Sequence, residues 1–187
     1  SVDLSDTTNI HKIIFKEFLT NSVPLDGYVN NAAVAYDDII TNLQIDKLRV
    51  MYNVNVFSPM LLTKYAIRNM LLHHIQGSII HISSISVHTG YKGLSMYASS
   101  KGALEAFSKD TAREWGQLGI RSNVVVPGFM ETAMSSSLTE EQKDRIYKTK
   151  GFVDCEASQG YLLCIIPIVF LSHFIVCLMN DRQRNKM

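Results

Sequence analysis

The sequence has few features of a disulfide-stabilised, metal-binding or nucleic-acid-binding protein. Its 187 residues include three cysteines, an odd number without the spacing of metal ligands: Cys155, Cys164 and Cys177. A disulfide framework and a zinc site are therefore not expected, and we predict a reducing, cytoplasmic location. The formal net charge is +1 and no basic patch stands out, which argues against nucleic acid as a partner. The chain opens with SVDLSD, without a signal peptide or an initiator methionine, as expected of a segment cut from a longer sequence.

Apolar segments alternate with helix-forming segments through most of the chain. We expect strands at residues 1–4, 25–30, 78–82 and 120–126, and helices at residues 7–21, 45–75 and 97–115. Within the longest helical region, Pro59 predicts either a kink or the first turn of a second helix. Strands separated by helices are typical of a parallel sheet with crossover connections. The sequence therefore predicts an α/β fold, and its 47% of hydrophobic residues can supply the core.

Tyr97 precedes Lys101 by four residues at the start of the last predicted helix. Residues at this spacing lie on one face of a helix, so we expect the ammonium beside the phenol. A neighbouring positive charge favours the phenolate and lowers the pKa of a tyrosine from its usual value of about 10 toward neutrality. A tyrosine with such a pKa can act as a general acid or base. The alternative is a solvated helix face without a catalytic role.

Polar residues follow two of the predicted strands, at the positions where open α/β sheets bind ligands. Asn30 ends the strand at 25–30 and Asn31 follows it, and Ser84 lies just beyond the strand at 78–82. The two asparagines can instead be turn formers. His81 lies between isoleucines inside a strand, and we expect a packed, hydrogen-bonded imidazole there and not a catalytic one.

Several motifs occur together in an order that resembles the short-chain dehydrogenase/reductase family. They are NNA at 30–32, Asn55, Ser84, Tyr97 with Lys101, and PGFMET at 127–132. The resemblance covers roughly residues 1–148 and is greatest to the 3-oxoacyl-[acyl-carrier-protein] reductase type. It implies a Rossmann-like, doubly wound parallel sheet with NADP or NAD as cofactor. It also implies hydride transfer between that cofactor and a small carbonyl or alcohol substrate, such as a 3-oxoacyl group or another ketone.

The resemblance implies a role for each matching residue. Tyr97 would exchange a proton with the carbonyl oxygen, and Lys101 would lower the Tyr97 pKa and bind the nicotinamide ribose. Ser84 would hold and polarise the carbonyl, and Asn55 would bind a water in a proton relay. The positions that match cofactor-binding residues of the family are Asp3, Leu4, Asn31, Tyr97, Lys101, Pro127, Gly128, Met130 and Thr132. No metal is expected.

One feature of the family is absent from the sequence. The family begins with a strand, a glycine-rich turn and a helix that receives the pyrophosphate, but neither G-x-x-x-G-x-G nor G-x-G-x-x-G occurs here. We therefore expect a sheet that lacks the first β-α-β segment and the usual C-terminal strand. The alternative to an enzyme is a noncatalytic, truncated reductase that cannot hold cofactor, either anchored in a membrane or paired with a full-length relative. The resemblance also implies homo-oligomers that form through the helices around residues 55–74 and 98–115.

The last part of the sequence differs in character from the rest. We divide the chain into a partial Rossmann-like oxidoreductase domain, residues 1–150, and a divergent hydrophobic tail, residues 151–187. Residues 161–179 carry no formal charge and precede a basic end. As a helix they would be roughly 28 Å long, enough to cross a bilayer core. The segment is therefore a membrane anchor, a packed or partner-bound segment, or an out-of-frame tail without a selected role.

Overall fold

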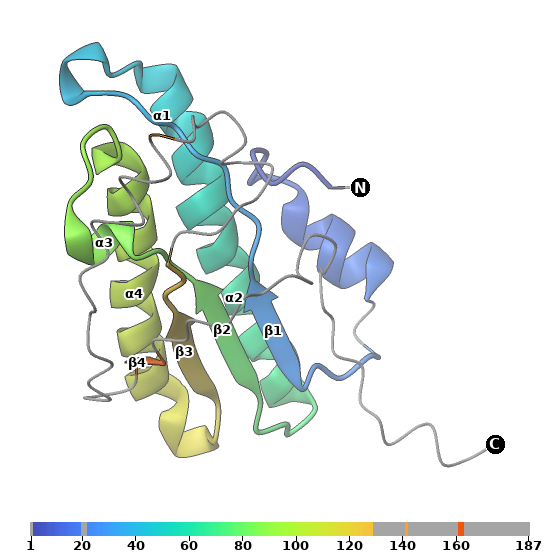
Figure 1. Ribbon diagram of the computed structural model, residues 1–187. Helices are drawn as coiled ribbons and strands as arrows, with labels where there is room; N and C mark the ends of the chain where they lie inside the picture. Colours follow the sequence, from blue (N-terminus) through green and yellow to red (C-terminus); the bar gives the residue numbers. More distant parts are fainter. Residues whose placement is uncertain (1, 20–21, 129–140, 142–160, 163–187) are drawn as a thin grey trace.

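A parallel sheet forms the centre of the computed structural model, which describes residues 2–19, 22–128, 141 and 161–162. The strands follow the order β1-β2-β3-β4, and every neighbouring pair is parallel. Their bounds are Gly27–Asn30 for β1, Ser78–Ile82 for β2, Arg121–Val125 for β3 and Tyr161–Leu162 for β4. The predicted Rossmann-like parallel α/β fold is confirmed (Figure 1).

Helices connect the strands and cover the sheet. The described helical elements are η1 (Lys12–Phe18), η2 (Ile40–Asn42), α1 (Ile45–Tyr52), η3 (Asn53–Phe57), α2 (Ser58–Leu72), α3 (Ser86–Thr89), α4 (Ser95–Trp115) and η4 (Gly116–Leu118). The connection from β1 to β2 contains α2, which packs against β1, and the connection from β2 to β3 contains α4, which packs against β2 and β3. Figure 1 shows α2 and α4 running along the sheet.

The strand register brings three strand ends to one edge of the sheet. Asn30 at the end of β1 pairs with His81 in β2, and Ile82 at the end of β2 pairs with Val125 at the end of β3. The segments that follow these strands therefore begin side by side. In open α/β sheets this edge is where ligands bind.

Apolar side chains from β2, α2, η1 and the residues that flank η1, β1 and β3 form the main core. Its buried members are Ile10, Phe15, Leu19, Leu25, Leu62, Ala66, Ile67, Met70, Ile79 and Ile120. The rings of Phe15 and His11 lie 5.7 and 4.7 Å from that of Tyr65, so η1 packs against α2. Burying a side chain as large as Met70 stabilises a fold by about 1.5–3 kcal/mol.

A polar cluster lies within this fold beside the core. The Asn30 amide nitrogen is 3.1 Å from Thr63 Oγ1 and 3.0 Å from His81 Nδ1, while Tyr28 donates to Asn30 Oδ1. The His81 ring also meets the Phe107 ring edge-on. Burial, and secondarily the charge of Lys101, lowers the pKa of His81 to about 4. The prediction of a packed, hydrogen-bonded imidazole at His81 is thus confirmed. Asn30 is a buried hydrogen-bonding residue and not a turn former.

The predicted and observed elements differ in several places. Residues 2–4 do not form the predicted strand, and the first helix contains a π-helical segment, η1. The long helical region at 45–75 is divided into α1, η3 and α2. Pro59 lies in the first turn of α2, so the second of the two alternatives predicted for Pro59 is confirmed. The cause is local: Pro59 has no N–H to donate, and the first turn of a helix needs none.

The hydrophobic tail contributes one short strand. Tyr161 and Leu162 form the two-residue strand β4 and pair in parallel with Val124 and Val125. No helix within the described part of the chain is both long and apolar enough to cross a membrane. The rest of the proposed anchor, residues 163–179, and the boundary at residue 150 lie outside the described residues.

Candidate active site

Two helical turns of α4 carry the predicted catalytic pair to the carboxyl edge of the sheet. Tyr97 and Lys101 lie in the first turns of α4, and the Lys101 ammonium is 5.8 Å from the centroid of the Tyr97 ring. The prediction that both side chains share one face of the helix is confirmed. The Lys101 ammonium also donates a hydrogen bond of 2.8 Å to the carbonyl oxygen of Ile82, the last residue of β2.

The environment of Lys101 is unusual for a lysine. Its side chain is buried, with 2% of the residue exposed. Burial penalises the charged form and lowers the pKa of Lys101 to about 8. An ammonium has three N–H donors, and Ile82 O accepts one of them within the described part of the chain. Lys101 therefore keeps its charge at neutral pH and has donors to offer a ligand.

The pKa of Tyr97 differs from the prediction. Burial raises it above its usual value, the negative charge of Asp37 raises it further, and a hydrogen bond with Ser84 lowers it by less than these two effects together. The prediction of a lowered pKa is therefore wrong for this structure. The physical reason is that Lys101 lies against the face of the ring and directs a hydrogen bond to β2, while burial acts on the phenol directly.

Ser84 lies on the loop between β2 and α3. Its hydroxyl oxygen accepts hydrogen bonds from the backbone nitrogen of Ser86 at 3.2 Å and from the Ser86 hydroxyl at 3.0 Å. Backbone hydrogen bonds fix the loop against the end of β3, from Ser83 N to Val125 O and from Ile85 N to Pro127 O, both 2.9 Å. Because Ser86 supplies donors to the Ser84 oxygen, the Ser84 proton can be donated to Tyr97 or to a carbonyl oxygen.

Asn55 lies in the π-helical segment η3, between α1 and α2. Its side-chain amide donates to Val34 O at 2.9 Å and to Ser100 Oγ at 3.0 Å, and accepts from Val34 N at 2.9 Å. A π-helical turn inside a helix is frequent at functional sites. Here it brings the Asn55 side chain between the loop that follows β1 and helix α4. Both N–H bonds of the amide are used, so the amide can offer a water the second lone pair of Oδ1.

Replacing Asn55 with leucine should lower the free energy of unfolding by about 2–4 kcal/mol, because the fully buried Asn55 amide makes hydrogen bonds to the Val34 backbone and to Ser100 that leucine cannot make. Urea unfolding of the wild-type and variant chains measures this loss. The control is Asn42→Leu, since the Asn42 amide bonds Asp38 at an exposed position. Equal stability of the Asn55→Leu variant and the wild type would show that these contacts contribute nothing.

The predicted cofactor-binding residues fall into two groups. Leu4 is tied to the start of α2, since its carbonyl oxygen accepts from Ser58 Oγ at 2.6 Å, and the Asp3 carboxylate is exposed and accepts from the backbone of Ser5. That hydrogen bond lowers the pKa of Asp3. The second group follows the strands at the carboxyl edge of the sheet: Asn31 after β1, and Pro127 and Gly128 after β3. Met130 and Thr132 lie outside the described residues.

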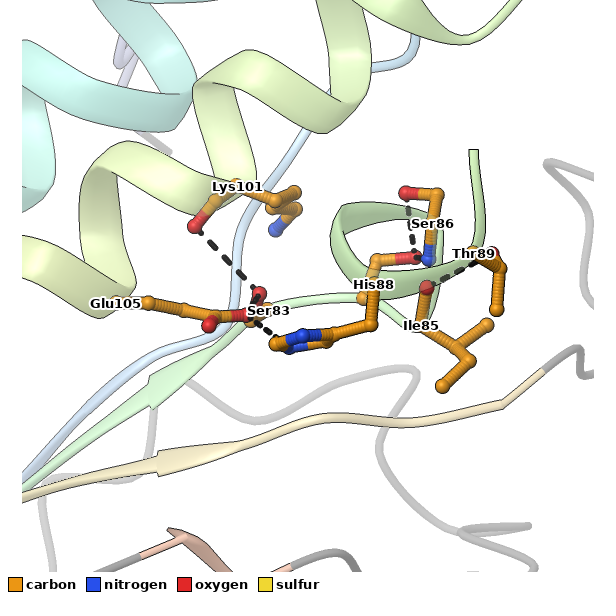
Figure 2. A network of polar contacts seen from close by, with 8 residues as sticks. Ser83, Ile85, Ser86, His88, Thr89, Lys101 and Glu105 are labelled. Atoms are coloured by element: carbon orange, nitrogen blue, oxygen red, sulfur yellow. Dashed lines mark hydrogen bonds and ion pairs between the residues drawn. The ribbon is translucent and has the colours of Figure 1, made fainter. Parts of the chain in front are cut away.

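Sequence reasoning missed several residues around the predicted pair. Asp37 acts on Tyr97 through its charge, and burial raises the pKa of its own carboxyl group. Ser86 bonds to Ser84, and its position two residues later could have revealed it. Glu105 on α4 bonds to the loop that carries Ser84 (Figure 2). It follows Lys101 by four residues, a spacing that places it on the same helix face.

Comparison with known sequences decides the family. A sequence profile described as short chain dehydrogenase matches residues 1–143. The chain belongs to the short-chain dehydrogenase family. Carbonyl reductase family member 4 of Xenopus tropicalis is 32% identical over 177 residues, which cover 94% of this chain and 74% of that protein. The 3-oxoacyl-[acyl-carrier-protein] reductase FabG of Salmonella typhimurium is 36% identical over 119 residues. That match covers 64% of this chain and 48% of FabG, so the chain spans about half the length of several relatives in the family.

Solved structures of short-chain dehydrogenases share the fold. A gluconate 5-dehydrogenase from Burkholderia cenocepacia, in complex with NADP and tartrate, superposes with a TM-score of 0.73 at 24% identity, over 79% of this chain and 58% of that one. A 4-hydroxyisoleucine dehydrogenase complexed with NADH gives a TM-score of 0.65 at 28% identity, over 71% of this chain and 58% of that one. The described chain therefore has the architecture of short-chain dehydrogenases whose structures contain a nicotinamide cofactor.

Proposed function

We propose that this short-chain dehydrogenase transfers hydride between NADP or NAD and a small carbonyl or alcohol substrate, of which a 3-oxoacyl group or another ketone is the expected type. The observation that carries the proposal is the convergence of three side chains at one sheet edge. Tyr97 and Lys101 share a face of α4, and Ser84 approaches Tyr97 from the loop after β2. A phenol, an ammonium and a hydroxyl in this arrangement can protonate and polarise a carbonyl oxygen.

Each of these groups has a separate task in the proposed reduction. The Ser84 hydroxyl, whose oxygen accepts from Ser86, donates its proton to the carbonyl oxygen as a hydrogen bond and withdraws electron density from the carbonyl carbon. A nicotinamide cofactor, when bound, would supply the hydride that this carbon accepts. Tyr97 gives its proton to the oxygen, which becomes the alcohol oxygen, and recovers a proton from solvent. The raised pKa of Tyr97 keeps the phenol protonated before this step.

Lys101 and Asn55 support the proton transfer without touching the carbonyl. The buried Lys101 charge stabilises the phenolate that forms when Tyr97 gives up its proton. We propose that Asn55 holds a water through the free lone pair of its Oδ1 and connects the lysine to solvent.

The residues around Lys101 fit the nicotinamide end of the cofactor. Lys101 has N–H donors beyond the one bonded to Ile82, and ribose hydroxyls are suitable acceptors for them. We propose that Pro127 and Gly128 border the nicotinamide and that Asn31 lies beside the adenosine ribose. Asp3 and Leu4 are proposed to contact the adenine. Met130 and Thr132, which lie outside the described residues, are proposed for the nicotinamide segment.

A noncatalytic chain that pairs with a full-length relative is the second candidate function. The observation that favours pairing is exposed apolar surface on a helical region of the described chain. Pairing, like a homo-oligomer of this chain, is proposed to use the helices around residues 55–74 and 98–115. Phe57 and Leu72 are exposed apolar side chains within the first of these regions.

Titrating NADPH and NADH into the purified chain separates the two functions. If the chain is an enzyme, the fluorescence of the cofactor should change saturably, and Lys101→Ala should weaken binding by about tenfold because charge-assisted hydrogen bonds to the ribose are lost. The matched control is Lys64→Ala, which removes an exposed lysine on α2 and should bind as the wild type does. A folded chain that binds neither cofactor would contradict the enzyme and support the noncatalytic pairing chain.

A further inference from the structure

A buried carboxylate connects α4 to both ends of the loop that carries Ser84. Glu105 Oε1 accepts a hydrogen bond of 2.5 Å from Ser83 Oγ and lies 3.2 Å from His88 Nε2. Figure 2 shows the Glu105 side chain directed from α4 toward Ser83 and His88, with α3 beyond them. Ser83 immediately precedes Ser84, and His88 follows Ser84 in α3. The loop of Ser83 to His88 is thus held by one carboxylate at its two ends.

The burial of this carboxylate calls for an explanation. Only 5% of Glu105 is exposed, and a buried charge is costly unless hydrogen bonds replace its hydration. Ser83 and His88 are those partners: Ser83 Oγ donates to Glu105 Oε1, and His88 Nε2 lies 3.2 Å from the same oxygen. His88 is itself partly exposed, with 44% of its side chain accessible. A leucine at position 105 would fill a similar space but could not accept these hydrogen bonds, so the carboxyl group connects α4 to the loop.

The position of Glu105 on α4 relates the loop to the proton donor. Glu105 follows Lys101 by four residues and Tyr97 by eight, so all three fall on one face of the same helix. The Ser83 hydroxyl lies between Glu105 and the carbonyl oxygen of Lys101, which is 3.5 Å away. A rigid helix therefore carries both the phenol and the group that holds the Ser84 loop. Any loosening at Glu105 would change the distance between Ser84 and Tyr97.

We propose that Glu105 is a positioning residue that acts through Ser83 and His88 to hold the Ser84 hydroxyl in reach of Tyr97 and of a carbonyl oxygen. The proposal rests on the proposed reductase function and extends it to a residue that does not touch substrate. The backbone bonds from the loop to β3 fix its distance from the sheet. Glu105 adds a connection between the loop and α4, which the backbone bonds to β3 do not provide. Misplacing a catalytic group by about 1 Å can reduce a rate on the order of 10²-fold.

The first test reports on the Ser84 to Tyr97 contact without any turnover. In a chain with ¹³Cζ-labelled tyrosine, the Tyr97 resonance is assigned by its loss in Tyr97→Phe, and its shift at neutral pH reports hydrogen bonding to the phenol. We expect Glu105→Leu to move this resonance in the same direction and by a similar amount as Ser84→Ala. Glu105→Gln keeps an oxygen acceptor for Ser83 and His88 and should remain near the wild type. A Glu105→Leu resonance at the wild-type position, with Ser84→Ala displaced, would overturn the proposal.

Two milder variants keep this test valid if Glu105→Leu does not fold. Ser83→Ala and His88→Ala each remove one of the two contacts of Glu105, and circular dichroism verifies that they fold. Each should displace the Tyr97 resonance in the direction seen for Ser84→Ala, by a smaller amount. If both folded variants leave the resonance unchanged, Glu105 has no positioning role.

The second test uses turnover and a double-mutant cycle. Ser84→Ala and Glu105→Leu should each lower kcat, with KM changed little, and the double variant should be no slower than Ser84→Ala alone, because Glu105 then has no hydroxyl to position. Glu105→Gln should recover most of kcat. Independent, multiplicative losses would overturn the proposal. If the wild type has no reductase activity, the proposed function fails, while the resonance shifts still decide whether Glu105 positions Ser84.

Discussion

Replacing Tyr97 with phenylalanine should reduce the turnover of carbonyl reduction by about 10²–10⁴-fold, the usual contribution of a general acid. The variant loses one oxygen atom, and with it the proton that the carbonyl oxygen receives and the partner of the Ser84 hydroxyl. The ring itself stays in place over the Lys101 ammonium, 5.8 Å from its centroid. Cofactor affinity should therefore change by no more than about twofold.

Measurements of kcat and of NADPH affinity on the same preparation check this expectation. Tyr65→Phe is the matched control, because it removes the same atom from a tyrosine of α2 that packs against η1, outside the candidate site. It should retain wild-type turnover. Undiminished kcat in Tyr97→Phe would exclude Tyr97 as the proton donor, and a joint loss of kcat and of cofactor binding would point to damage of the site as a whole.

The pattern of the sequence predicts the fold well, because the relevant signals are local. The apolar run at 78–82 became β2 with unchanged bounds, and the helix predicted at 97–115 became α4 with its start moved to Ser95. The division of residues 45–75 at Pro59 was also visible from the chemistry of proline. Residues 2–4 show the limit of such reasoning. They are held by the start of α2, through Ser58 and Leu4, and a contact between such distant positions leaves no local signal.

The placement of Tyr97 and Lys101 was predictable from the sequence, but the electrostatics around them was not. The spacing of Tyr97 and Lys101 correctly placed both on one helix face. The direction of the Tyr97 pKa depends on burial and on Asp37, which reaches the phenol from a loop 60 residues earlier in the chain. Likewise the amide contacts of Asn55 with Val34 and Ser100 form only once two distant segments meet at η3. The direction of the Tyr97 pKa shift and the partners of Asn55 depend on the tertiary structure, so residue spacing alone could not predict them.

We expect the buried Lys101 side chain to lower the free energy of unfolding at neutral pH. Its pKa in the folded chain is about 8, below the 10.5 of an unburied lysine, because burial disfavours the ammonium. At pH 7 both the folded and the unfolded chain carry the proton, and the folded chain bears the desolvation of the charge. Between about pH 8 and pH 10 the unfolded chain still binds this proton while the folded chain has lost it. Stability should therefore rise with pH in this window, by about 1.4 kcal/mol per unit at most.

Replacing Lys101 with methionine removes this dependence and should make the chain more stable than the wild type at pH 7. The difference in the free energy of unfolding should be about 2–3 kcal/mol, reduced by the hydrogen bond that Ile82 O loses, and it should shrink as the pH rises toward 10. Urea unfolding at several pH values measures the difference, with Lys64→Met, at an exposed position on α2, as the control without a pH trend. A constant difference across this range would mean that Lys101 is not held as a desolvated charge. The same variant should lose turnover, because in the proposed mechanism the Lys101 charge stabilises the phenolate of Tyr97, a gain that would offset its cost to stability.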